Sequence, residues 1–113
     1  MFELLRKVFP DGSQAPKMLM HGWSGGADMT KMYCKHFPNM YFSFSAPLRG
    51  KQLKGGVKSV PIKRLLMETD DKRPVHIFET YNVVISHLAE TKEFEETRMI
   101  AIVGDNFKAL FDL

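Results

Sequence analysis

Two side chains with the chemistry of metal ligands each follow a short apolar run. His21 ends the run that begins at residue 17, and a glycine pair at 25–26 comes shortly after it. Asp70 ends the run that begins at residue 65. Where parallel strands alternate with helices, reactive groups lie at the carboxyl ends of the strands. We therefore expect His21 and Asp70 to share one site at the carboxyl edge of a parallel sheet.

Each of these signals also has a purely structural interpretation. A single histidine such as His21 is often a hydrogen-bonded structural residue rather than a ligand. Glu68 lies two residues before Asp70, so the two would share a face of a strand; Glu68 would either support a ligand or be a buried acid paired with a base. The pair Gly25–Gly26 would either bind an anion at a helix amino terminus or simply form a turn.

Length and composition indicate one domain of a globular protein. The chain has 113 residues, 44% of them hydrophobic, and a net charge of +3. No apolar run reaches the roughly 18 residues typical of a membrane helix, and residues 1–9 are typical of an amphipathic helix rather than a secretion signal. We expect a cytoplasmic or nuclear protein that uses no membrane. The single Cys34 excludes an internal disulfide and has no evident catalytic base beside it.

Basic residues gather between the second and third predicted strands. The group has six members: Arg49, Lys51, Lys54, Lys58, Lys63 and Arg64. They would either steer a nucleic acid through its phosphates or form an ordinary solvated surface.

Periodicity and turn residues predict strands that alternate with helices. Helices are expected over 2–9, 28–36 (capped by Asp28), 51–59, 75–91, 95–103 and 105–111, the last two divided by Gly104. Strands are expected over 17–23, 40–45 and 65–69. His36 and His87 fall within helices and His76 near a helix start, so none of them is at a strand end. The pattern predicts an α/β fold with about three parallel strands and flanking helices.

Four segments, in this order, resemble motifs of the TatD-type metal-dependent deoxyribonucleases of the amidohydrolase superfamily. They are His21-Gly-Trp-Ser-Gly25, Tyr41-Phe-Ser-Phe-Ser45, Pro61-Ile-Lys-Arg-Leu-Leu-Met-Glu-Thr-Asp70 and Asn106-Phe-Lys-Ala-Leu-Phe111. The family has a His-Cys-Phe-Ser-Gly motif at the first and a Leu-Leu-Val-Glu-Thr-Asp motif at the third. Gly22 and Trp23 depart from the first motif. Asp71 stands where the family often has alanine or serine.

The resemblance implies a partial (β/α)₈ TIM-type barrel, in which residues 1–113 form one domain and supply the equivalents of strands six to eight. It implies hydrolysis of DNA phosphodiester bonds with Mg²⁺, Mn²⁺ or Zn²⁺, His21 and Asp70 as metal ligands and Asp70 as the catalytic proton carrier. The family's His-x-His pair is absent. We therefore expect the isolated chain to be incomplete for catalysis, unless self-association or a partner supplies the other half-barrel. The alternative is a non-catalytic half-barrel that acts in interactions or nucleic-acid binding.

Overall fold

Helices and strands alternate along the chain. The computed structural model describes residues 1–45, 50–68 and 74–113, and the side chains of all of these except 74–78. In chain order the elements are α1 (Phe2–Val8), a 3₁₀ turn (Gly12–Gln14), β1 (Met18–Met20), α2 (Ala27–His36), β2 (Met40–Phe44), α3 (Lys51–Ser59), a 3₁₀ turn η2 (Ile62–Arg64), β3 (Leu65–Met67), α4 (Pro74–Lys92) and α5 (Glu96–Leu110). Within these residues no helix is both long and apolar enough to cross a bilayer.

The three strands form one parallel sheet in the order β1-β2-β3. Met20 lies opposite Phe42, and Phe44 lies opposite Met67. Helix α2 connects the first pair of strands and α3 connects the second, as parallel neighbours require. The predicted α/β class, with three parallel strands and flanking helices, is confirmed and is consistent with part of a TIM-type fold. Residues that follow β1 and β3 consequently lie at the same edge of the sheet.

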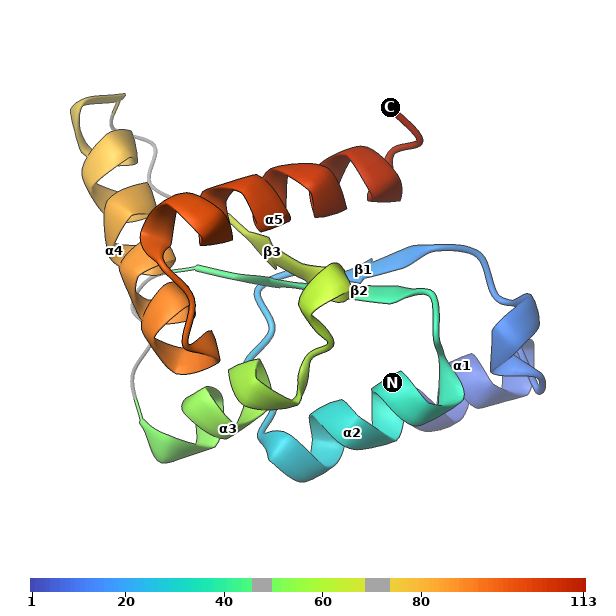
Figure 1. The fold of residues 1–113 in the computed structure, drawn as a ribbon. Helices are drawn as coiled ribbons and strands as arrows, with labels where there is room; N and C mark the ends of the chain where they lie inside the picture. Colours follow the sequence, from blue (N-terminus) through green and yellow to red (C-terminus); the bar gives the residue numbers. More distant parts are fainter. Residues whose placement is uncertain (46–49, 69–73) are drawn as a thin grey trace.

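The core lies around β2, whose five residues are all buried. Figure 1 shows α2 and α3 below the strands and α5 crossing above β3. Trp23, which follows β1, packs edge-on against Tyr33 of α2 and Phe42 of β2, at ring-centroid distances of 5.2 Å in both cases. Full burial of one such apolar side chain contributes about 1.5–3 kcal/mol. This packing fixes the segment that follows β1 against the sheet.

The prediction of two helices divided by Gly104 is wrong. Helix α5 runs without a break from Glu96 to Leu110. A Cβ added at Gly104 would have no atom within 4 Å, so this glycine faces open space. Its helix-propensity cost of about 1 kcal/mol is outweighed by the buried face of the same helix, formed by Met99, Val103 and Asn106.

Three predicted boundaries also need correction. The strand expected over 17–23 ends at Met20, because Gly22 has a φ of +61° and turns the chain. The strand expected over 65–69 ends at Met67, and residue 69 lies outside the described residues. Asp28 does not cap α2: the N-cap is Gly26, and Asp28 lies in the first helical turn.

Candidate functional site

His21 and Glu68 meet at the carboxyl edge of the sheet. His21 follows β1 directly and Glu68 follows β3 directly. His21 Nδ1 lies 2.5 Å from Glu68 Oε2. The histidine side chain is 65% exposed, whereas that of the glutamate is only 12% exposed. Glu68 is therefore a largely buried acid paired with a base, and because that base is the candidate ligand His21, the pairing agrees with both interpretations open for Glu68.

Ser43 of β2 connects this pair to the central strand. Its Oγ donates a hydrogen bond to Glu68 Oε2 and accepts one from the main-chain N–H of Gly22 at 3.3 Å. Two main-chain hydrogen bonds continue the sheet ladder past the strand ends: Trp23 N–H to Ser43 O and Glu68 N–H to Phe44 O, each 2.9 Å. The site is therefore fixed by contacts among all three strands.

Ser43 is a site residue that the sequence patterns did not predict. It is 2% exposed and lies between Phe42 and Phe44, in a strand with no exposed residue. A hydroxyl group in so apolar a strand needs a buried hydrogen-bond partner. That requirement was the available signal, although the sequence does not say that the partner is Glu68.

The glycine turn after His21 has a structural role. The indole N–H of Trp23 donates to Thr30 Oγ1 at 2.8 Å, and the Thr30 hydroxyl donates to Gly26 O at 2.7 Å. A Cβ at Gly25 would lie 2.4 Å from the Trp23 ring, and one at Gly56 would lie 2.1 Å from Gly25 O. Glycine at 56 therefore lets α3 approach the turn, and glycine at 25 leaves room for the Trp23 ring, which gives Gly25 a structural role without an anion.

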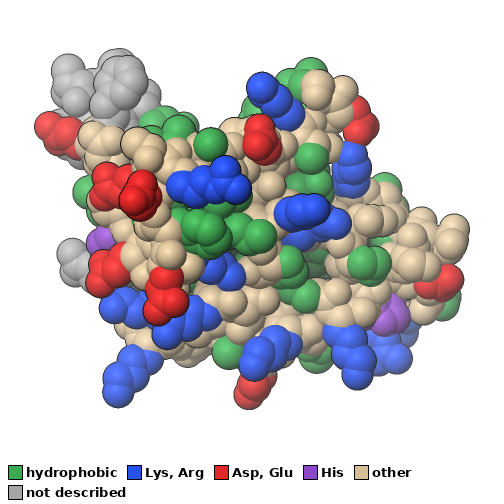
Figure 2. All heavy atoms as spheres, in the orientation of Figure 1, with side chains coloured by type: hydrophobic (Ala, Val, Ile, Leu, Met, Phe, Trp, Pro, Cys, Tyr) green, Lys and Arg blue, Asp and Glu red, His purple; other side chains and the backbone are tan. Residues whose placement is uncertain are grey.

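The predicted basic group divides between two elements. Lys51, Lys54 and Lys58 are exposed on α3, whereas Lys63 and Arg64 belong to η2. The Arg64 guanidinium donates to Pro38 O at 3.0 Å and lies over the Tyr41 ring, which gives it a structural role. Figure 2 shows Lys and Arg side chains dispersed over one face with Asp and Glu among them. Arg49 and the predicted ligand Asp70 lie outside the described residues.

The other histidines and the cysteine belong to helices and not to strand ends. His36 is the last residue of α2, and its Nε2 lies 3.3 Å from Phe9 O; His87 lies within α4. The side chain of His76 lies outside the described ones. Cys34 of α2 is partly buried, and burial raises the pKa of its thiol, so the unreactive protonated form is favoured.

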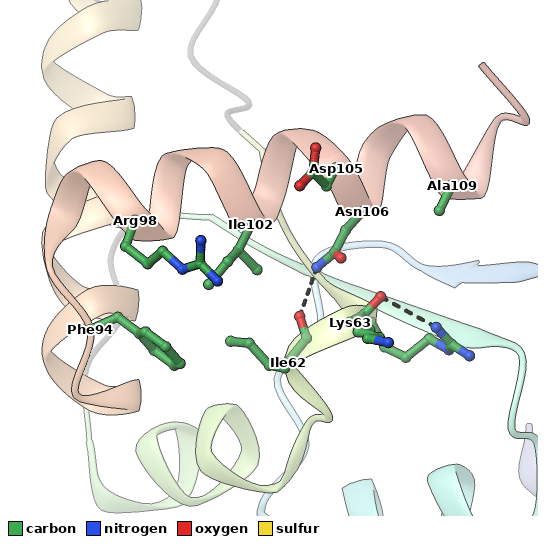
Figure 3. A pocket seen from close by; sticks show the side chains of 9 residues that line it. Ile62, Lys63, Phe94, Arg98, Ile102, Asp105, Asn106 and Ala109 are labelled. Carbon is green, nitrogen blue, oxygen red and sulfur yellow. Dashed lines mark hydrogen bonds between the residues drawn. The ribbon is translucent and has the colours of Figure 1, made fainter.

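A hollow of about 390 Å³ lies at the opposite end of β3, between η2 and α5. Its lining combines the apolar Ile62, Phe94 and Ile102 with the charged Lys63, Arg98 and Asp105 (Figure 3). Asn106 closes one side and donates to Ile62 O at 2.7 Å. Because η2 precedes β3, this hollow is at the amino end of the strand and contributes nothing to the His21–Glu68 site.

Comparison with known proteins assigns the chain to a family. Residues 1–112 match the model of the family described as TatD related DNase. This chain belongs to the TatD-related DNase family. Among curated proteins, it is 32% identical over 114 residues to YabD of Bacillus subtilis strain 168, an uncharacterized metal-dependent hydrolase. The match covers 89% of this chain and 43% of that protein, so the chain spans less than half the length of its relative.

The donor chemistry at the His21–Glu68 edge suits the divalent metal that TatD-family membership implies. An imidazole backed by a carboxylate is a common arrangement for a metal-binding histidine. Glu68 Oε1 is buried, and among the described residues it has no hydrogen-bond partner. The described residues contain no group of three or more His, Cys, Asp or Glu that could hold a metal. His21, backed by Glu68, fits one side of a metal site, and further ligands would be needed to complete the site.

Proposed function

We propose that this chain contributes one side of a metal-dependent site that hydrolyses phosphodiester bonds of DNA. Family membership supports the reaction class, and the name of the Bacillus subtilis relative supports the use of a metal. The observation that carries the proposal is the imidazole of His21, held at the carboxyl end of β1 by a nearly buried carboxylate. A DNA substrate agrees with the cytoplasmic or nuclear location expected from the sequence.

His21 would bind the cation through a ring nitrogen. Asp70, two residues after Glu68, would add a carboxylate ligand, accept a proton from the attacking water and return it to the leaving oxygen. When bound, Mg²⁺, Mn²⁺ or Zn²⁺ would polarise the phosphodiester and lower the pKa of a water molecule towards neutrality. Catalytic zinc usually has three protein ligands, so residues from the remainder of a family barrel, on this or another chain, would supply the others.

Cleavage of labelled DNA by the purified chain tests this function. The reaction is run with Mg²⁺, Mn²⁺ or Zn²⁺ and again with a chelator. Asp70→Asn and His21→Asn remove the proposed ligands, and Asp28→Asn, an exposed carboxylate change in α2, is the matched control. Where self-association supplies the remaining ligands, we expect metal-dependent cleavage that is lost in the first two variants and kept in the control. Cleavage that is equal in all variants, or that persists in chelator, contradicts the proposal. If no cleavage occurs at any protein concentration, the chain alone is not the nuclease.

The second candidate is an interaction role, and the surface beside β3 favours it. A groove of about 690 Å³ is lined by apolar side chains that include Met67 of β3, Ile85 of α4 and Ile100, Val103 and Phe107 of α5. β1 and β3 each have one neighbouring strand within the described sheet, which leaves two edges that can pair. A second copy that placed its β1 beside β3 would keep the strands parallel and cover the groove.

Light scattering across a concentration series tests this association. Ile100 is 57% exposed in the groove, and Ile100→Lys should shift a dimer to monomer. Leu4, 62% exposed on α1, provides the control variant Leu4→Lys, which should leave the dimer unchanged. A monomer at all concentrations contradicts self-association.

Salt-dependent DNA binding that persists in chelator indicates a non-catalytic nucleic-acid binder instead.

A further inference from the structure

The hydrogen-bond donors around Glu68 determine which nitrogen of His21 carries a proton. The Ser43 hydroxyl has one hydrogen, which it donates to Glu68 Oε2, while its oxygen accepts from the Gly22 N–H. The same Oε2 faces His21 Nδ1 at 2.5 Å. An ionised carboxylate only accepts hydrogen bonds. His21 Nδ1 must therefore be the donor, and in a neutral imidazole the lone pair then lies on Nε2.

The carboxylate has little freedom to adopt another arrangement. Its backbone is tied to β2 through the Glu68 N–H bond to Phe44 O. Its second oxygen, Oε1, is buried, and a Cβ placed on Gly22 would lie 3.4 Å from it. A Cβ at residue 22 would make only an ordinary van der Waals contact with the glutamate, and it is the φ of +61° there that favours glycine. The turn after β1 and the end of β3 thus hold the carboxylate behind the imidazole.

We propose that Glu68 is the positioning residue of His21, which fixes the Nδ1–H tautomer and presents Nε2 as the ligating nitrogen. This inference rests on the proposed function, in which His21 binds a divalent cation. A carboxylate behind a ligating histidine fixes the ring and increases its basicity, and loss of such a partner typically weakens metal binding by about 10–100-fold. Ser43 acts one step further back, because it orients the carboxylate that orients the imidazole.

The tautomer can be measured without any metal. Long-range ¹H–¹⁵N correlation spectra of the 113-residue chain distinguish Nδ1–H from Nε2–H imidazoles, at alkaline pH where the histidine spectrum no longer changes. We expect His21 as the Nδ1–H tautomer. His36 is an internal reference of the opposite kind, because its Nε2 faces the carbonyl oxygen of Phe9, which can only accept. An Nε2–H tautomer at His21 in the unmodified chain overturns the inference, whatever any variant does.

Two variants separate the hydrogen bond from the charge. Glu68→Ala should release His21 to the Nε2–H tautomer, whereas Glu68→Gln keeps an acceptor oxygen and should retain Nδ1–H. His36 should stay unchanged in both. A Glu68→Ala spectrum in which His21 keeps its tautomer refutes the positioning role. If Glu68→Ala does not fold, the unmodified chain and Glu68→Gln still decide the question.

Zinc titration followed at the His21 ¹⁵N resonances adds the metal readout. We expect Zn²⁺ to shift Nε2 in the unmodified chain, with an apparent affinity about 10–100-fold weaker in Glu68→Ala. Equal affinities in the two proteins overturn the inference. An Nδ1–H tautomer that is lost in Glu68→Ala, with no zinc response in either protein, supports the positioning of His21 and counts against the proposed function instead.

Discussion

Two adjacent glycines of α3 should respond in opposite ways to the same substitution. A Cβ at Gly55 would lie 3.4 Å from Ala27 Cβ, an ordinary contact. A Cβ at Gly56 would lie 2.1 Å from Gly25 O, where no real Cβ fits without movement of the backbone. Gly55→Ala should therefore be tolerated, whereas Gly56→Ala should force α3 away from the turn that follows His21.

The two effects can be estimated separately. Alanine is favoured over glycine inside a helix by about 1 kcal/mol, and this gain applies at both positions. Forcing an extra methyl group into a packed site costs about 1–3 kcal/mol, and this applies only at Gly56. Backbone atoms yield less readily than a flexible side chain, so we expect the upper part of that range. Gly56→Ala should be less stable than Gly55→Ala by roughly 2–3 kcal/mol.

Urea unfolding followed by circular dichroism measures this difference as a change in midpoint at constant slope. The single Trp23 provides a second, local probe, since it packs beside Gly25. The chemical shifts of the His21 resonances should also change in Gly56→Ala and remain unchanged in Gly55→Ala. Equal midpoints, or a more stable Gly56→Ala, would show that α3 does not approach the glycine turn as described and would refute the reasoning.

Two further predictions concern the core. Asn106→Ala removes the hydrogen bonds from Nδ2 to Ile62 O at 2.7 Å and Leu65 O at 2.8 Å, and leaving such carbonyls unsatisfied should cost about 2–4 kcal/mol in urea unfolding. The exposed Asn82→Ala should change stability by under about 0.5 kcal/mol, and equal losses in both would contradict the role of Asn106. Burial raises the pKa of Tyr33 above its usual value near 10. Its neutral form is therefore favoured in the folded state, and stability should fall as pH rises above 10. Tyr33→Phe should reduce this loss of stability at high pH. An unchanged pH profile of stability in Tyr33→Phe would contradict the assignment to Tyr33.

Local patterns predicted the elements well where one signal dominated. Helix α3 has the predicted bounds of 51–59, and α4 runs from Pro74 to Lys92 where a helix over 75–91 was expected. The predicted break between two helices at Gly104 was wrong because glycine was taken as a local helix breaker. The buried face of α5 stabilises the helix across this position. Propensity is a weak signal of this kind, and tertiary packing overrides it.

The candidate site was predictable only in part, because its contacts join distant positions. The apolar run that ends at His21 indicated a site near the carboxyl end of a strand, although that strand was expected to reach residue 23. The spacing of Glu68 and Asp70 raised a buried acid–base pair as one interpretation of Glu68. The sequence did not identify His21 as the partner, since they are 47 positions apart and meet only through the sheet register. The same holds for Ser43, whose hydrogen bond to Glu68 spans 25 positions. For Asp70 the ligand role stays a prediction.

The register of β2 is the feature on which the described part of the site depends most. Side chains alternate between the faces of a strand, so a slip of one residue would turn Ser43 away from Glu68 and replace its hydroxyl with an aromatic ring. The register is held by burial of Phe42 and Phe44, both 0% exposed, and by Trp23 packed against Phe42. Burial of these aromatic side chains, none of which carries the chemistry, thus fixes the relative positions of His21 and Glu68.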